Sequence, residues 1–124
     1  FGDTDSGGIV YHPRYLEMAE RGRNELMRGF GLDVGSLFKE GVIGLALRSA
    51  DMKFYSPAFF DDKLTITTKL KRLTSASSEW ITVIRSGGTR ICTVKADVIC
   101  IDRIKRIPVI YPAEVKSVFL KCVQ

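Results

Sequence analysis

The sequence predicts a single α+β domain, in which an antiparallel sheet packs its apolar face against one long helix. Two observations support this prediction. Apolar residues recur at helical spacing near the start of the chain, whereas later segments alternate between apolar and polar residues. Tight turns join the alternating segments, as is typical of antiparallel strands. A chain of 124 residues fits one domain and can bury a core without disulfides or metals.

The long helix is predicted over residues 15–30. Pro13 suits the first helical position, because its missing N–H group would be unpaired there in any residue. Gly31 is a natural stop signal. Gly22 lowers helix propensity, so we attribute it to close packing against another backbone. The positions at helical spacing are Tyr15, Met18, Ala19, Gly22, Leu26 and Phe30.

A short second helix is expected over residues 34–40, with Asp33 as its cap and Gly41 as its end. The pattern then becomes alternating. The apolar residues fall first at odd positions, Leu45 and Leu47, and then at even positions, Ala50, Met52 and Phe54. A change of parity inside one strand indicates a β-bulge, here near Arg48 and Ser49.

Three further strands are expected before a helix at the C-terminus. The clearest covers residues 64–71, where apolar and polar side chains alternate strictly. A polar turn over residues 74–78 precedes a strand over residues 80–85, and Gly87-Gly88 is a hairpin signal before the last strand, residues 92–100. Pro112 opens a helix that runs through Leu120.

The net charge is +5 and the sequence pI is about 9.3, which favours an anionic partner. Nucleic acid is one candidate class, but no recognition motif for it is present, and we expect no nucleic-acid function. The phosphates of coenzyme A would suit a basic surface equally well. Charge alone does not choose between these partners.

Cysteine usage and hydropathy point to the cytoplasm. Cys92, Cys100 and Cys122 match no zinc or redox spacing, so we interpret them as reduced thiols. No apolar run is long enough for a bilayer, and no signal-peptide pattern opens the sequence. We expect residues 1–124 to form one domain. Because its first residue is Phe1 and not Met, we also expect that the beginning of its first strand is missing.

The segment over residues 2–13 carries the chemistry. Two carboxylates, Asp3 and Asp5, and the only histidine, His12, lie here among glycines, directly before the long helix. A helix start presents free backbone N–H groups and the positive end of the macrodipole, which suits a developing oxyanion. A nearby carboxylate can attack a carbonyl or activate water. The same residues also make a good turn, and a metal site is a further alternative, although the ligand spacing is generic.

Several separated motifs resemble the 4-hydroxybenzoyl-CoA thioesterase family, and in particular its tol-pal-associated acyl-CoA thioesterases. The similarity covers almost the whole chain and is weakest after Ile104. Its motifs occur in the same order as in the family. They are Asp3-Thr4-Asp5-Ser6-Gly7-Gly8-Ile9-Val10-Tyr11-His12-Pro13-Arg14-Tyr15-Leu16, Glu20-Arg21-Gly22-Arg23, Met52-Lys53-Phe54-Tyr55-Ser56-Pro57-Ala58 and Asp61-Asp62-Lys63-Leu64-Thr65-Ile66.

This resemblance implies a hotdog fold, a curved antiparallel sheet wrapped around a long central helix. It implies hydrolysis of acyl-CoA thioesters without a metal or other cofactor. It also implies a homo-oligomer, a dimer or homotetramer, with active sites at the subunit interface. The inner face of the membrane and an acyl carrier protein are further candidate partners.

The family's catalytic carboxylate corresponds to Asp5, as nucleophile or general base. Its carbonyl-polarising backbone amide corresponds to His12, whose side chain also matches a histidine thought to assist catalysis. Tyr11, with Gly8 and Pro13, matches the substrate-binding positions. The resemblance assigns no residue to the coenzyme A phosphates, because the turn over residues 74–78, basic in some relatives, is not basic here.

One position departs from the branch, which often has Tyr where this chain has Phe1. A mechanism that needs that hydroxyl is therefore in doubt, whereas one based on Asp5 is not. A non-catalytic acyl-CoA or acyl-carrier binding module and a hotdog dehydratase remain alternatives. We interpret Asp61-Asp62 as turn residues, because adjacent residues on a strand point to opposite faces. Glu20, Arg21 and Arg23 are interpreted as a solvated or structural ion-pair set.

Overall fold

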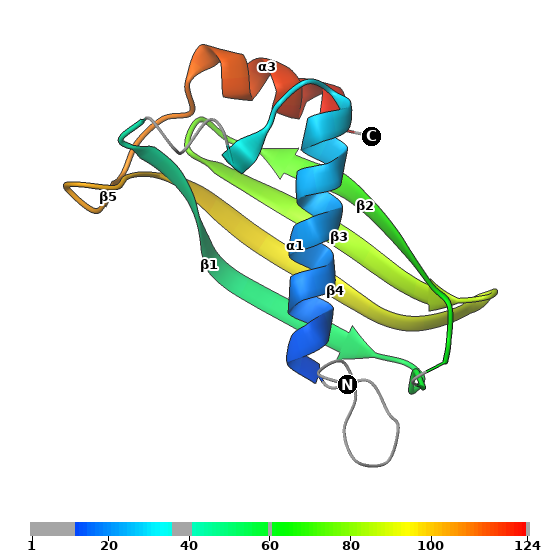
Figure 1. Ribbon diagram of the computed structural model, residues 1–124. Coiled ribbons are helices and arrows are strands. Elements are labelled where there is room, and N and C mark those ends of the chain that lie inside the picture. The colour runs from blue at the N-terminus through cyan, green and yellow to red at the C-terminus, as the bar shows by residue number, and fades with distance from the viewer. Residues whose placement is uncertain (1–11, 36–40, 60, 124) are drawn as a thin grey trace.

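The computed structural model describes residues 12–35, 41–59 and 61–123 (Figure 1). Helix α1 spans His12–Gly29 and α3 spans Ala113–Cys122. The strands are β1 (Ile43–Phe54), β2 (Leu64–Leu73), β3 (Ser77–Ser86), β4 (Thr89–Asp102) and β5 (Ile107–Pro108). The α+β prediction is therefore confirmed, and helices are present near both predicted positions.

The strands form one antiparallel sheet in the order β1-β4-β3-β2, with β5 paired to β4. The prediction of four strands was wrong by one, since β5 was not expected. It has only two residues, one of them Pro108, and so carries no alternating pattern of its own. Backbone pairing of Ile101 with Pro108 and of Asp102 with Ile107 creates it.

The predicted β-bulge is confirmed. The register of β1 against β4 shifts between Leu47 and Ser49, so Arg48 is the extra residue. Without that insertion, one half of β1 would turn its apolar side chains away from the core, because side chains alternate along a strand. The bulge thus reconciles the two parities in the sequence.

Helix α1 lies across one face of the curved sheet, and α3 covers the end of the same face near the start of β1 (Figure 1). The core forms two clusters between helices and sheet. One contains Trp80, Tyr111 and Phe119 at the α3 end, and the other contains Tyr15, Ile84 and Cys92 at the start of α1. The interpretation of the three cysteines as thiols is confirmed: each is buried and free.

Of the predicted second helix, only Val34 and Gly35 are described, and both are helical. The backbone N–H group of Gly35 donates to Asp33 Oδ1 at 3.1 Å, as expected of a capping aspartate. Residues 36–40 lie outside the described residues. No helix in the described part of the chain is long and apolar enough to cross a membrane.

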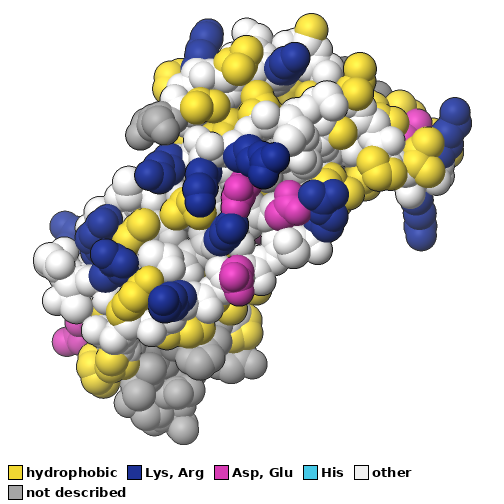
Figure 2. Space-filling view, turned by 180° about the vertical axis from the view of Figure 1, so that it is seen from behind, with side chains coloured by type: hydrophobic (Ala, Val, Ile, Leu, Met, Phe, Trp, Pro, Cys, Tyr) yellow, Lys and Arg dark blue, Asp and Glu magenta, His cyan; other side chains and the backbone are white. Residues whose placement is uncertain are grey.

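The face of the sheet opposite α1 is charged (Figure 2). Arg48 pairs with Asp97 at 2.7 Å, and Lys95 pairs with Glu79 at 2.7 Å. These residues lie on β1, β3 and β4, so the pairs cross neighbouring strands. Both ion pairs therefore lie on the sheet face that α1 does not cover.

Candidate active site

The first turn of α1 contains the described part of the predicted site. The helix begins at His12, directly after the motif, and no acidic side chain lies in its first turn. Its leading backbone N–H groups therefore have no carboxylate from that turn as acceptor. Pro13 is exposed. Asp5, Gly8 and Tyr11 lie outside the described residues, as does the His12 side chain, so their roles remain predictions.

Tyr15 anchors this first turn to the sheet. Its side chain is buried, and its ring meets the Phe54 ring edge-on with 5.5 Å between the centroids. Burial raises the pKa of Tyr15, an effect that a backbone hydrogen bond at Ala58 opposes. The phenol therefore stays protonated and acts as a packing group. Because Phe54 ends β1, this contact positions the helix start against the end of the strand that borders the sheet in the described residues.

A turn after β1 lies close to Tyr15. Asp62 Oδ2 accepts a hydrogen bond from the Phe59 backbone N–H at 2.8 Å, and the Asp62 N–H donates back to the Phe59 carbonyl at 3.0 Å. The interpretation of the aspartate pair as turn residues is confirmed for Asp62. Its carboxylate also acts on the Tyr15 phenol electrostatically, so the turn faces the start of α1.

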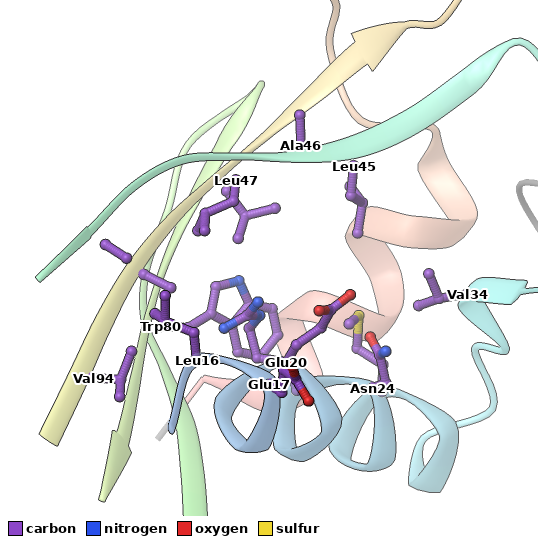
Figure 3. Close-up of a pocket in the computed structure, with 15 residues that line it drawn as sticks. Leu16, Glu17, Glu20, Asn24, Val34, Leu45, Ala46, Leu47, Trp80 and Val94 are labelled. Carbon is purple, nitrogen blue, oxygen red and sulfur yellow. The ribbon is translucent and has the colours of Figure 1, made fainter. Parts of the chain in front are cut away.

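A cleft of about 320 Å³ opens between α1 and β1 (Figure 3). Its floor is apolar and comes from the sheet, whereas α1 supplies its polar wall. The cleft begins at Leu16, about one helical turn from the helix start. It is lined by Leu16, Glu17, Glu20, Arg23, Asn24, Met27, Val34, Leu45, Ala46, Leu47, Ala50, Trp80, Val94, Ala96 and Val98.

Arg23 is the unexpected residue of this cleft. Only 9% of it is exposed, although it carries a charge. Desolvation lowers the pKa of the Arg23 guanidinium, and the negative charge of Glu20 opposes that shift. Glu20, Arg21 and Arg23 were interpreted as a solvated or structural ion-pair set. Glu20 and Arg21 are exposed, as the solvated alternative expects, whereas the buried Arg23 fits the structural alternative. Helical periodicity alone did not indicate that Arg23 lies over the sheet.

Sequence reasoning missed the cleft itself. Trp80 and Leu45 line it from β3 and β1, and neither belongs to a motif with chemical meaning. The sequence predicted only that each of them lies on a strand. In the described ranges, no group of three or more His, Cys, Asp or Glu side chains gathers as metal ligands. The alternative of a metal at Asp3, Asp5 and His12 lies outside those ranges.

Comparison with known proteins identifies the class of this chain. Residues 1–120 match the Thioesterase-like superfamily. The chain is 30% identical over 117 residues to the acyl-CoA thioesterase YbgC of Haemophilus influenzae, covering 94% of this chain and 86% of that relative. It is 27% identical over 122 residues to the 1,4-dihydroxy-2-naphthoyl-CoA hydrolase of Thermosynechococcus vestitus, covering 94% and 84%. The chain therefore belongs to the Thioesterase-like superfamily.

Solved structures agree with this assignment. A probable thioesterase from Bartonella henselae superposes with a TM-score of 0.81 at 35% identity, over 89% of this chain and 90% of that one. The predicted resemblance to this class of enzyme is confirmed, and so is the prediction that the chain is a thioesterase.

Proposed function

We propose that this protein hydrolyses acyl-CoA thioesters to a free carboxylic acid and coenzyme A. Asp5 acts as nucleophile or general base, and the backbone N–H group of His12 polarises the thioester carbonyl. The start of α1 at His12 carries this proposal, because it puts the first backbone N–H groups of the helix, which have no acceptor within the helix itself, directly after the Asp5 motif. The names of the relatives, which act on acyl-CoA or naphthoyl-CoA thioesters, support the substrate class.

The chemistry follows from the charge that develops during reaction. Attack on the thioester carbonyl converts its oxygen into an oxyanion, which N–H donors and the positive end of α1 stabilise. If Asp5 attacks, water then hydrolyses the resulting anhydride; if Asp5 is a base, it removes a proton from the attacking water. Either route consumes one water molecule and releases the acid and the thiol of coenzyme A. Tyr11, Gly8 and Pro13 contact the substrate beside this centre.

A second copy of the chain completes the cleft. Within the described part, β1 is a terminal strand of the sheet, and the cleft opens directly beside it. Leu47 of β1 is half exposed, and the buried guanidinium of Arg23 faces the same opening. An apolar edge beside a desolvated charge is suited to a protein partner rather than to water. The proposal includes a dimer or tetramer, with an active site at each such interface.

The proposal also covers the hotdog arrangement and the compartment. Contacts of α1 with β2, β3 and β4 support a central helix around which the sheet curves. Three free, buried thiols suit the reducing cytoplasm. An acyl carrier protein remains a candidate source of the acyl group.

The test replaces Asp5 with the nearly isosteric Asn. The kcat of purified Asp5→Asn should fall roughly 100-fold, the lower end of what a general base contributes. The assay measures release of the coenzyme A thiol from a panel of short, long and aromatic acyl-CoA substrates. Asp51→Asn, an exposed carboxylate on β1, is the control and should keep wild-type turnover. Wild-type turnover by Asp5→Asn would refute the mechanism.

The same panel separates the alternatives. A pure binding module would retain acyl-CoA in equilibrium dialysis and release no thiol in either the wild type or the variant. A dehydratase would convert a hydroxyacyl-CoA to the enoyl-CoA with the thioester intact. Turnover of acyl-CoA to free thiol by the wild type excludes both.

A further inference from the structure

The β4–β5 hairpin, residues 102–110, combines exposed apolar and basic side chains at one end of the molecule. Ile104, Ile107 and Ile110 are 76%, 48% and 70% exposed. Most large apolar side chains bury much of their surface on folding, so three isoleucines this exposed within one short segment indicate a surface that awaits a partner. This end projects beyond the rest of the sheet, at the left in Figure 1 and the right in Figure 2.

The exposure of these side chains is built into the hairpin. Asp102 Oδ1 accepts hydrogen bonds from the backbone N–H groups of Ile104 and Lys105, both at 2.9 Å. Arg106 closes the turn with a hydrogen bond from its N–H to the Asp102 carbonyl at 2.7 Å, and its φ is 58°. These bonds shape a tight turn that holds Ile104 outward instead of letting it fold back onto the sheet.

The backbone beyond the turn is equally well held. The Val109 N–H donates to the Cys100 carbonyl, and the Tyr111 N–H donates to the Ser75 carbonyl. Val109 and Tyr111 pack against the core cluster at the α3 end, whereas Ile110 between them points outward. Ile110 is therefore exposed because the hydrogen-bonded backbone directs its two neighbours toward the core.

The charge on this hairpin is positive. Arg103 and Lys105 flank Ile104, Arg106 precedes Ile107, and Asp102 is the only acidic residue of the hairpin. Asp102 is already engaged in the turn, and the Lys105 backbone N–H group holds the pKa of its carboxyl below the ordinary range. The surface therefore carries three cations around the apolar Ile104, and one of them, Arg103, also donates a hydrogen bond to the Gly41 carbonyl at 3.4 Å.

We propose that the β4–β5 hairpin docks this protein on an anionic lipid surface, with Ile104 inserted among the acyl chains and Arg103, Lys105 and Arg106 at the headgroups. The complementarity has two parts, as reversible membrane binding requires: burial of apolar surface and attraction of basic side chains to acidic lipids. A protein partner of opposite charge would satisfy the cations, but it would also need a preformed pocket to receive Ile104 at the apex of the turn. A bilayer accepts a convex apolar point without a preformed pocket. The proposal is independent of the catalytic mechanism above.

Vesicle sedimentation of the whole chain tests it. The protein should sediment with vesicles made of equal parts phosphatidylglycerol and phosphatidylcholine, and should stay in solution with phosphatidylcholine alone. Ile104→Ser should lower the partition coefficient roughly tenfold through lost apolar burial. Lys105→Gln should lower it about fivefold and weaken its dependence on salt. Neither variant should change hydrolysis of a short-chain, soluble acyl-CoA.

Two neighbouring residues on α3 supply matched controls. Leu120 is 58% exposed and Lys121 follows it, so Leu120→Ser and Lys121→Gln make the same chemical changes outside the hairpin. Both should bind vesicles as the wild type does. An environment-sensitive dye on Ile104→Cys should shift its emission to the blue on addition of the acidic vesicles, and labelling is selective because the three native thiols are buried.

Each opposing result overturns the proposal. Equal losses in the α3 variants would show general adhesion rather than docking by the hairpin. If light scattering showed a different oligomeric mass for Ile104→Ser, the hairpin would be a contact between two copies of this chain. If Lys105→Gln raised the KM for acyl-CoA and left vesicle binding intact, Lys105 would bind coenzyme A and not lipid. Absence of sedimentation with acidic vesicles would refute lipid binding outright.

Discussion

Gly22 of α1 lies against Thr68 of β2 so closely that a Cβ atom on Gly22 would come within 2.5 Å of Thr68 Oγ1. The Thr68 side chain has little room to move, because its Oγ1 shares a hydrogen bond of 3.1 Å with Thr82 Oγ1. Ile66 Cγ2 would be 3.1 Å away on the other side. The helix can therefore approach the sheet this closely only with glycine at position 22. The sequence predicted close packing at Gly22 against another backbone, but the nearest atoms belong to side chains of β2.

Gly22→Ala should lower the free energy of unfolding by about 1–3 kcal/mol, since overpacking outweighs the helix propensity that alanine adds. Urea denaturation measures the change. Gly29→Ala is the matched control, because a Cβ atom there meets nothing within 4 Å. The double variant Gly22→Ala/Thr68→Ala should recover part of the loss, and equal stability of Gly22→Ala and wild type would contradict the packing argument.

Ser78 joins two buried side chains, those of Trp80 and Tyr111, at the α3 end of the core. The Trp80 indole N–H donates to Ser78 Oγ at 2.8 Å, and the Tyr111 hydroxyl lies 2.9 Å from the same oxygen. Ser78→Ala leaves the indole N–H group without this acceptor, so we expect a loss of roughly 1–3 kcal/mol in unfolding free energy. Chemical denaturation followed by Trp80 fluorescence measures it. The exposed Ser117→Ala should change stability little, and a comparable loss there would undermine the assignment.

The turn that faces Tyr15 depends on Asp62. Asp62→Ala removes the acceptor for the Phe59 N–H group, so we expect a loss of about 1 kcal/mol in stability and reduced turnover through displacement of the helix start. Asp61→Ala, at the exposed neighbouring position, should leave both quantities near wild type. Thermal unfolding and thiol-release assays on the pair provide the comparison. If Asp62→Ala and Asp61→Ala had the same stability and turnover, the turn would not support the site.

Buried thiols make stability depend on alkaline pH. Burial raises the pKa of Cys92 to about 11, and it raises the pKa values of Cys100 and Cys122 as well. Above the ordinary thiol pKa near 9, the unfolded chain loses these protons while the folded chain keeps them. The stability contributed by the protonated thiols is therefore complete below pH 9 and is lost as the pH rises towards 11.

Urea titrations between pH 8 and pH 11 should accordingly show a falling midpoint, with a shallower fall in Cys92→Ala at the alkaline end. Native thiols should react slowly with an aromatic disulfide reagent at pH 8 and rapidly after unfolding, because the thiolate is the reactive form. Fast labelling of the native protein would show that these side chains are accessible.

Local patterns allowed much of the fold to be predicted. The change of parity between Leu47 and Ala50 was sufficient to place the bulge, because side-chain alternation is a property of one strand. Strand β5 could not be predicted, because pairing with β4 alone defines its two residues. Asp5 and His12 could be proposed because they belong to one contiguous motif, whereas Arg23 and Trp80 meet in the cleft from separate elements.

The sequence by itself determined the order and type of the main elements, the bulge, and the motif that leads into α1. These depend on backbone periodicity and on residues adjacent in the chain. Only the tertiary structure decided that Arg23 is desolvated over the sheet, that Gly22 meets Thr68, and that isoleucines of the β4–β5 hairpin remain exposed. Burial is a property of surfaces that meet in space, and no single segment contains it.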